Sequence, residues 1–420
     1  MSSKIIRHLT QLATPQGKEA CHGQAMNKLL LTADAAVWME DGIIRAAGRD
    51  DEVVAKARAA GTLSGCEMID GSGQCAVPGF VDPHTHFLFA GARAEEFDDR
   101  LAGVPYLTLL QRGGGIVATM DKTRRASEAE LMEHGRRVLW AMLAMGVTTV
   151  EGKSGYGLDR DTELRLLHVL QQLDDELPTT VIPTYLGAHA VPPEYRDHPD
   201  DYVDFMIHTV LPQVASGHLA DFVDVFCEKG VFSLAQSRKI LTAAKKHGLA
   251  LKLHADEMSS LGGAELACEL GAVSADHLLS VSDAGIRRLA ASPTVAVLLP
   301  ATAFCMRKPY APARRLIDAG AAVALASDYN PGSCYTYSLP LVFGLAVIAM
   351  HMTAAEALTA ATLNAAAAVG RAGECGSIEP GKRADLVLLQ APDYRYLSYA
   401  TGLNLADRVF KDGQLVSQRK

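Results

Sequence analysis

The sequence predicts an α/β protein: a TIM-like (β/α)8 barrel that carries a small β-sandwich domain built from both chain termini. Buried strands alternate with helices along the middle of the chain, polar residues follow nearly every strand, and both ends are rich in hairpins. Eight strand–helix units over about 300 residues match a barrel of parallel strands. A doubly wound open sheet is the alternative fold.

Short strands and turns characterise both ends of the chain. Near the N-terminus, Asp41-Gly42 separates two apolar runs, and Asp412-Gly413 does the same near the C-terminus. Asp-Gly between alternating apolar residues is typical of a two-residue hairpin. The segment 384–389 adds a further strand. We therefore predict three segments: 1–77 and 376–420 as the two parts of the β-sandwich domain, and 78–375 as the barrel.

Eight apolar runs in the middle of the chain are the predicted barrel strands. They are 79–81, 148–151, 180–185, 222–226, 250–254, 272–276, 295–299 and 322–326. Helices are expected between most of them. Ser127 and Glu130 form a capping-box pattern for a helix that ends at Gly146, and a second helix is expected over 233–247. Thr353 and Glu356 cap an alanine-rich helix expected over 353–372.

Composition narrows the class of protein. With 49% hydrophobic residues a large core is expected, and the net charge of −8 disfavours binding to nucleic acid. The eight cysteines form no C-x-x-C pair, which favours reduced thiols in a reducing compartment. No secretory signal is evident, and the most apolar run, 339–350, is too short for a membrane span. We expect a cytoplasmic homodimer without nucleic-acid or membrane partners.

Two histidines one residue apart are the most informative feature of the chain. His84 and His86 follow the apolar run 77–81. Strand side chains repeat every two residues, so both imidazoles should lie on one side of the chain. Two neutral imidazoles at the end of a strand can chelate one metal ion, and they suit zinc, iron or copper.

Polar residues after the other predicted strands extend this pattern. They are Glu151 and Tyr156, His189, Glu228, His254 and Glu257, Asp276 and His277, and Asp328 with Asn330, Gly332 and Ser333. In a barrel, the strand ends at the carboxyl face build the active site. Three histidines and one carboxylate suit a catalytic zinc or iron with a position left for water. We therefore predict that the ligands are His84, His86, His254 and Asp328.

The same residues suggest how water would be activated. A bound divalent ion lowers the pKa of water towards neutrality and generates hydroxide. Glu257, three residues after His254, is placed to act as a general base. His277 can orient the hydroxide or polarise a carbonyl, and Asp328 can combine metal binding with proton transfer.

The pattern VPGFVDPHTH at 77–86, followed by His254, His277 and Ser327-Asp328, resembles the amidohydrolase superfamily. Within it, several internal motifs are similar to those of the imidazolonepropionase family. They are HTHFLFAGAR at 84–93, GGGI at 113–116, EGKSGYGL at 151–158, YLGAH at 185–189, HADE at 254–257 and SDYNPGS at 327–333. The resemblance covers nearly the whole chain, and the set of motifs is specific.

The resemblance implies a reaction and a set of substrate contacts. Water would hydrolyse a ring C–N bond of 4-imidazolone-5-propanoate and give N-formimidoyl-L-glutamate, the third step of histidine degradation. The carboxylate tail of that substrate would pair with Arg93, whose guanidinium is always charged. The other contacts carried over by the resemblance are Tyr156, His189, Glu257, Asn330, Gly332 and Ser333. Glu257 acts either as the general base or as a substrate contact alone.

Other interpretations stay open at this point. Another mononuclear amidohydrolase, such as a deaminase of a nitrogen heterocycle, would use the same ligands with a different pocket. A non-catalytic scaffold would lack ligands that are all present here. The run Gly113–Gly115 is interpreted as a flexible loop over the pocket, because it lacks the ending of a phosphate-binding loop. Lys153 is unassigned, since relatives that bridge two metals with a modified lysine carry it elsewhere.

Overall fold

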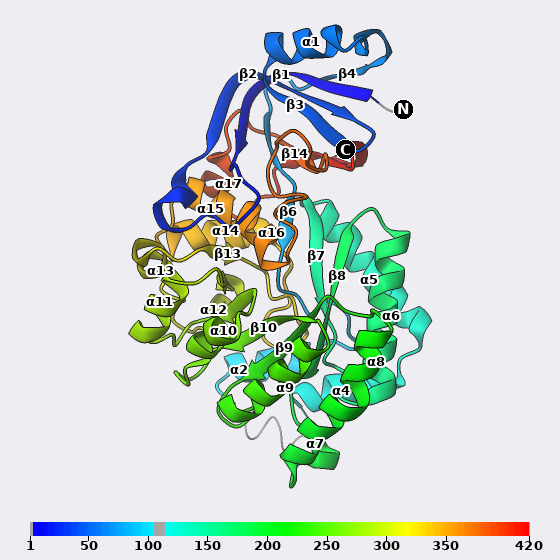
Figure 1. Cartoon of the computed structure of the whole chain (residues 1–420), viewed down its shortest axis with the longest axis vertical. Helices are drawn as coiled ribbons and strands as arrows, with labels where there is room; N and C mark the ends of the chain where they lie inside the picture. The colour runs from blue at the N-terminus through cyan, green and yellow to red at the C-terminus, as the bar shows by residue number, and fades with distance from the viewer. Residues whose placement is uncertain (1–2, 105–113, 420) are drawn as a thin grey trace.

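The computed structural model describes residues 3–104 and 114–419, and it places a strand barrel below a sheet that holds both termini (Figure 1). All eight predicted barrel strands are present. They are β6 (Phe80–Asp82), β7 (Val147–Lys153), β8 (Thr180–Ala188), β9 (Phe222–Cys227), β10 (Ala250–Ala255), β11 (Ser274–His277), β12 (Val295–Leu298) and β13 (Val323–Leu325). Neighbours pair in chain order, and every pair is parallel.

Both faces of the barrel strands are covered, which explains their continuous apolar character. Every residue of β7 and of β12 is buried. Helices lie around the outside of the barrel in Figure 1, with α5 and α6 on one side and α10, α11 and α13 on the other. The core therefore lies between the strands and this helical layer.

The first and last strands of the barrel approach each other where the strands end. Here Ser327 N donates to Asp82 Oδ1 at 3.1 Å and Asp328 N to His84 O at 3.1 Å. A third bond runs from His86 N to Tyr329 O at 2.9 Å. These bonds join the segment after β6 to the segment after β13, so the eight strands form a nearly closed barrel. The doubly wound alternative, whose edge strands stay apart, is thereby excluded.

The ends of the chain form a second sheet of eight strands, as predicted. Its strands are β1 (Ser3–Thr14), β2 (Leu30–Glu40), β3 (Ile43–Arg49), β4 (Glu67–Asp70), β5 (Cys75–Pro78), β14 (Leu386–Leu389), β15 (Ala406–Lys411) and β16 (Gln414–Gln418). The order is β16-β15-β14-β5-β1-β2-β3, and β4 also pairs with β1. N-terminal and C-terminal strands therefore meet where β14 pairs with β5. The segment limits at residues 77 and 375 stay a prediction.

Both predicted hairpin turns are present in this sheet. Asp41 and Gly42 have φ values of 48° and 81°, and Asp412 and Gly413 have 48° and 70°. Positive φ at both central residues is the geometry of a type I′ turn, which matches the twist of the flanking strands. Ala384 connects the two turns, because its N donates to Gly42 O and its O accepts from Gly413 N.

Helices connect the strands and bound the barrel. They are α1 (Asp50–Ala59), α2 (Ala94–Leu101), α4 (Ile116–Arg125), α5 (Glu128–Leu143), α6 (Arg160–Glu176), α7 (Pro199–Phe205), α8 (Leu211–Ser216), α9 (Leu234–Lys246), α10 (Gly263–Leu270), α11 (Asp283–Ala290), α12 (Pro300–Cys305), α13 (Ala313–Ala319), α14 (Leu339–Ile348), α15 (Ala354–Ala361), α16 (Leu363–Ala368) and α17 (Tyr396–Tyr399). No helix among the described residues is long and apolar enough to cross a membrane. In Figure 1, α2 and α4 lie at the end of the barrel away from the terminal sheet.

The predicted helix caps are confirmed, and one predicted helix proves to be two. Ser127 and Thr353 each accept from the backbone three residues on, and Glu130 and Glu356 reciprocate. The helix expected over 353–372 breaks at Thr362, whose φ of −128° and ψ of −90° lie outside the helical region. Its Oγ1 donates to Leu358 O at 2.6 Å, and such side-chain bonding to the backbone competes with helical continuation.

Candidate active site

The four predicted metal ligands converge at the carboxyl end of the barrel. His84 and His86 lie on the segment after β6, His254 lies on β10, and Asp328 follows β13. His84 Nε2 and His86 Nε2 are 3.3 Å apart, and His254 Nε2 is 3.4 Å from His86 Nε2. Asp328 Oδ1 lies 3.7 Å from His84 Nε2 and 3.6 Å from His86 Nε2. All four side chains are buried.

This spacing fits a metal ion. Tetrahedral bonds of about 2.0–2.1 Å, as for zinc to histidine, keep ligand atoms about 3.3–3.4 Å apart. Burial lowers the pKa of His84 and His86 well below the usual range, so both rings are neutral. Neutral rings that turn their Nε2 atoms towards one another can present these lone pairs to a cation. Geometry and charge thus agree with a mononuclear site of three imidazoles and a carboxylate.

Two aspartates on neighbouring strands fix the orientation of these rings. His84 Nδ1 donates to Asp276 Oδ2 at 2.6 Å, which leaves the Nε2 lone pair for a metal. His254 Nδ1 lies 2.9 Å from Asp224 Oδ2. Asp276 was noted in the sequence as a strand-end residue without a role, and Asp224 was missed. The available signal was an acidic residue inside the apolar strand 222–227, where burial demands a partner.

Glu257 and His277 form the candidate acid–base pair beside the ligands. His277 Nε2 lies 3.7 Å from Glu257 Oε2. Burial and the nearby Asp328 carboxylate raise the pKa of Glu257 to about 8. His277 has a φ of 78°, a strained conformation for a residue with a side chain, and such strain clusters at functional sites.

The loop that carries Glu257 is held by two acidic residues. Asp256 accepts hydrogen bonds from the backbone of residues 261–264. Glu228 accepts from Met258 N at 2.8 Å and from Ser259 N at 3.2 Å. Glu228 therefore braces the loop through its backbone, although the sequence had grouped it with the strand-end polar residues.

His189 and Tyr156 form another wall of the site. The His189 ring is stacked on His86 with centroids 4.8 Å apart, and Tyr156 lies 5.3 Å from His189. Burial lowers the pKa of His189 to about 3, so its Nδ1 donates to Gly155 O while Nε2 keeps a lone pair. The turn before α6 is held by buried Glu163, which accepts from Gly155 N, Gly157 N and Leu158 N. Sequence analysis missed Glu163.

Arg93 lies against the loop that follows Asp328. Its Nε donates to Pro331 O at 3.4 Å, and its Nη1 lies 3.5 Å from Glu96 Oε1. A Cβ at Gly332 would fall 1.6 Å from Arg93 Nη2, so only glycine leaves room for the guanidinium. Arg100, one helix turn beyond Glu96, donates to Gly332 O at 3.1 Å and was missed in the sequence.

Asn330 closes this loop on itself. Its Oδ1 accepts from Gly332 N at 2.8 Å and Ser333 N at 2.7 Å, and its Nδ2 donates to Asp328 O at 2.7 Å. These bonds are typical of an Asx-type turn. Asn330, Gly332 and Ser333, three of the predicted substrate contacts, therefore form one unit, whose position is tied to the predicted ligand Asp328.

Of the glycine run Gly113–Gly115 before α4, the structure describes Gly114 and Gly115. Gly113 lies outside the described residues, so the flexible loop over the pocket stays a prediction. Gly115 precedes α4 with a φ of 75°, and its N donates to Glu96 Oε2 at 2.7 Å. The described part of the run is thus linked to the helix that begins after Arg93.

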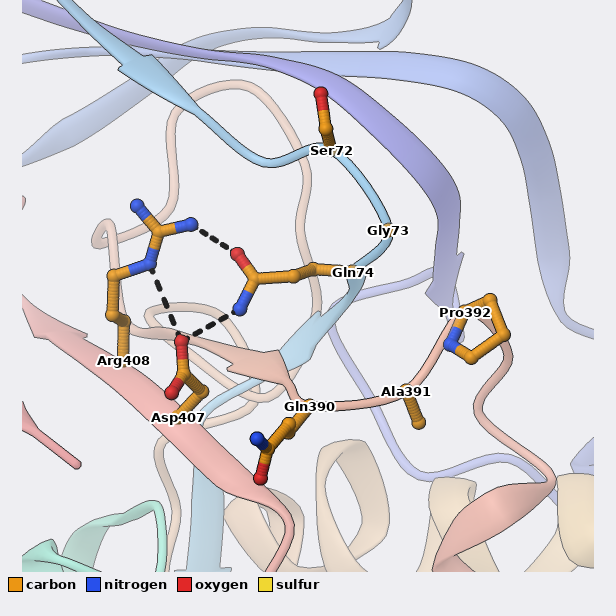
Figure 2. Close-up of a pocket in the computed structure, with 8 residues that line it drawn as sticks. All are labelled: Ser72, Gly73, Gln74, Gln390, Ala391, Pro392, Asp407 and Arg408. Carbon is orange, nitrogen blue, oxygen red and sulfur yellow. Dashed lines mark hydrogen bonds and ion pairs between the residues drawn. The ribbon is translucent and has the colours of Figure 1, made fainter. Parts of the chain in front are cut away.

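A separate pocket lies in the terminal sheet, and its polar side chains differ from those of the candidate active site (Figure 2). It is lined by residues from the turn before β5, the end of β14 and the start of β15. Gln74 Nε2 donates to Asp407 Oδ2 at 2.7 Å, and Arg408 donates to Gln74 Oε1. Figure 2 shows Gln74, Asp407 and Arg408 paired with one another, so the acid and the base among the residues that line this pocket are already engaged.

Comparison with known proteins gives one consistent result. The sequence profile of the amidohydrolase family matches residues 75–416. A protein of Parabacteroides distasonis named imidazolonepropionase is 53% identical over 414 residues, 99% of each chain. Curated proteins of Porphyromonas gingivalis, Clostridium tetani and Geobacillus kaustophilus carry the same name at 49–52% identity.

Solved structures share the fold at low identity. Guanine deaminase of E. coli superposes with a TM-score of 0.74 at 14% identity, with all of both chains covered. A mutant atrazine chlorohydrolase of Arthrobacter aurescens, complexed with zinc and atraton, gives 0.69 at 20% identity and covers 99% of this chain and 95% of its own.

Asp276→Asn tests the orientation of His84. An amide can donate where Asp276 only accepts, so the His84 tautomer is no longer fixed, and zinc affinity should fall about 10–100-fold. Competition with a chromogenic chelator measures the zinc affinity of the variant. Asp82→Asn is the matched control, because Asp82 is equally buried beside the ligands but accepts from Ser327 N. Unchanged zinc affinity in Asp276→Asn, or an equal loss in the control, would contradict this role.

Proposed function

The chain belongs to the amidohydrolase family, and we infer that it is an imidazolonepropionase. It hydrolyses a ring C–N bond of 4-imidazolone-5-propanoate to give N-formimidoyl-L-glutamate, the third step of histidine degradation. The full-length identity with curated imidazolonepropionases carries this conclusion. The structure adds a physical reason, since a cation suited to a carboxylate, Arg93, lies against the loop that follows the candidate ligand Asp328.

One divalent ion, zinc or iron, would be held by His84, His86, His254 and Asp328. Both metals accept three imidazoles and a carboxylate. When bound, such an ion lowers the pKa of a water molecule towards neutrality. Side chains of the protein supply proton transfer and substrate positioning.

Proton transfer is assigned to Glu257, His277 and Asp328. Glu257 accepts a proton from the attacking water, since its carboxyl group lies beside His277 and near Asp328. His277, 3.7 Å from Glu257, orients the water or polarises the substrate carbonyl. Asp328, beside His84 and His86, can accept the remaining proton of the added hydroxyl group and pass it to the departing ring nitrogen as the C–N bond breaks.

The remaining residues position the substrate. Arg93 pairs with the propanoate carboxylate. Tyr156 and His189 hydrogen-bond the ring or the tail from the opposite wall, with the His189 Nε2 lone pair as an acceptor. Asn330, Gly332 and Ser333 contact the substrate from the loop after Asp328, whose shape is fixed by the bonds from Gly332 N and Ser333 N to Asn330 Oδ1. A homodimer and a cytoplasmic location stay predictions from the sequence.

Product identification tests the proposed function. We expect purified protein, incubated with freshly generated 4-imidazolone-5-propanoate, to give N-formimidoyl-glutamate detectable by mass spectrometry. His84→Ala should lose both metal and product, because one of three imidazole ligands is removed. If metal-loaded protein gave no such product, the proposal would fail in favour of a deaminase of another carboxylated heterocycle.

Arg93→Ala should raise the KM at least tenfold while metal content stays near that of the wild type. The reason is the loss of a charge-assisted bond to the substrate carboxylate, worth about 1.5–3 kcal/mol. Gly332→Ala should act in the same direction, because its Cβ would displace the Arg93 guanidinium. Steady-state kinetics and metal analysis of each variant give the readout. Metal loss in Arg93→Ala would mean that Arg93 is structural.

Glu257→Gln separates the general base from a substrate contact. A base must be deprotonated, so kcat/KM should fall as the pH drops through the pKa of Glu257. That pKa is about 8 without an ion, and a bound cation moves it lower because it stabilises the carboxylate. In Glu257→Gln we expect this acid limb to vanish and kcat to fall about 10²–10⁴-fold. A loss confined to KM would instead identify Glu257 as a contact.

A further inference from the structure

A buried cluster of charged side chains lies beneath the candidate metal ligands. It consists of Glu151, Lys153, Asp224, Lys252 and Asp276, each with 0% exposure, on strands β7, β9, β10 and β11 of the barrel. Burying a charge is costly unless it is paired, so five together need a specific arrangement. The proposed catalytic steps use none of these side chains directly.

Lys153 links the two aspartates that orient the ligands. Its Nζ donates to Asp224 Oδ2 at 2.7 Å and lies 3.9 Å from Asp276 Oδ2. A third contact, to Glu151 Oε1, measures 2.9 Å. Asp224 contacts His254, and Asp276 accepts from His84. One ammonium group is therefore a single step removed from two of the four predicted ligands.

The surroundings of Lys153 resemble a second cation site. His84, Asp224 and Asp276 offer ligand atoms within 4.8 Å of one another, a combination that can hold a metal ion. The Lys153 ammonium lies within ion-pair distance of both aspartates in this group. Burial lowers its pKa, but Asp224, Glu151 and Asp276 outweigh that effect and raise it above the usual value, so the group stays charged.

We propose that Lys153 is a positioning residue: its ammonium group takes the place of a second metal ion and holds Asp224 and Asp276 where they orient His254 and His84. A single-ion centre thereby keeps the rigidity that two ions would give. The aspartates orient the two ligand rings, and Lys153 positions the aspartates. This inference rests on the proposed metal centre but not on the identity of the substrate.

The direction in which Lys153→Met changes the metal affinity distinguishes this positioning role from a purely electrostatic effect of the Lys153 charge. The cluster has two cations and three anions, a net charge of −1, and Lys153→Met would make it −2. Added negative charge by itself attracts a divalent cation more strongly. Lost orientation of two ligand rings weakens binding instead, typically 10–100-fold when such outer partners are removed. The two accounts thus predict opposite changes in metal affinity.

The experiment compares Lys153→Met with Lys252→Met in the full-length protein. Lys252 is an equally buried lysine whose hydrogen bonds go to Pro83 O, Glu151 and Ala368 O. Its charge also acts on Asp276, so Lys252→Met removes a similar charge and leaves the bond from Lys153 to Asp224 in place. Zinc affinity is measured by chelator competition, and ligand geometry by the visible absorption of the cobalt(II) form. We expect Lys153→Met to bind zinc at least tenfold more weakly with an altered cobalt spectrum, and Lys252→Met to stay within about threefold of the wild type.

Equal or tighter zinc binding in Lys153→Met with an unchanged spectrum would overturn the proposal, as would an equal loss in Lys252→Met. If Lys153→Met does not fold, Glu151→Gln combined with Lys153→Met keeps the net charge at −1 and still removes the contact to Asp224. We expect the same loss of affinity in that double variant, and wild-type affinity there would refute the role of Lys153. A wild type that binds no divalent ion would instead refute the metal centre itself.

Discussion

The bond from His84 Nδ1 to Asp276 is the interaction on which the site depends. It fixes the tautomer of a buried imidazole, and the tautomer decides whether Nε2 offers a lone pair or a proton. A carboxylate buried at this depth must itself be paired, and Lys153 lies within reach of it. The register of β10 against β11 sets His254 opposite Asp276, so one predicted ligand lies on the strand next to the aspartate that orients another.

Barrel closure and assembly of the site are one structural event. His84 and Asp328 lie on opposite sides of the junction between the first and last strands, and Asp328 N donates to His84 O across it. Two of the four predicted ligands therefore come together only when the barrel closes. After Asp328, Asn330 Oδ1 accepts from Gly332 N and so fixes the position of Gly332. Because Gly332 has no Cβ, the Arg93 guanidinium can lie against it.

Much of this arrangement could be predicted from the sequence, because the relevant signals are local. Strand periodicity placed His84 and His86 on one side, Asp-Gly pairs located both hairpin turns, and Ser127 marked a helix start. The roles of Asp224 and Lys153 could not be predicted, since they depend on contacts between strands far apart in the chain. Glu163 makes local contacts, to backbone N–H groups five to eight residues before it, but its position in helix α6 gives no sign of them. The break at Thr362 escaped prediction because alanine-rich flanks favour an unbroken helix.

The central claim is that three buried imidazoles and one carboxylate hold a single catalytic ion. X-ray absorption at the metal edge, combined with elemental analysis of the same purified protein, tests it most directly. The account predicts about one ion per chain, with outer-shell scattering from three histidine rings and nitrogen or oxygen neighbours alone. Two ions per chain, a sulfur ligand, or scattering from a single histidine would contradict it.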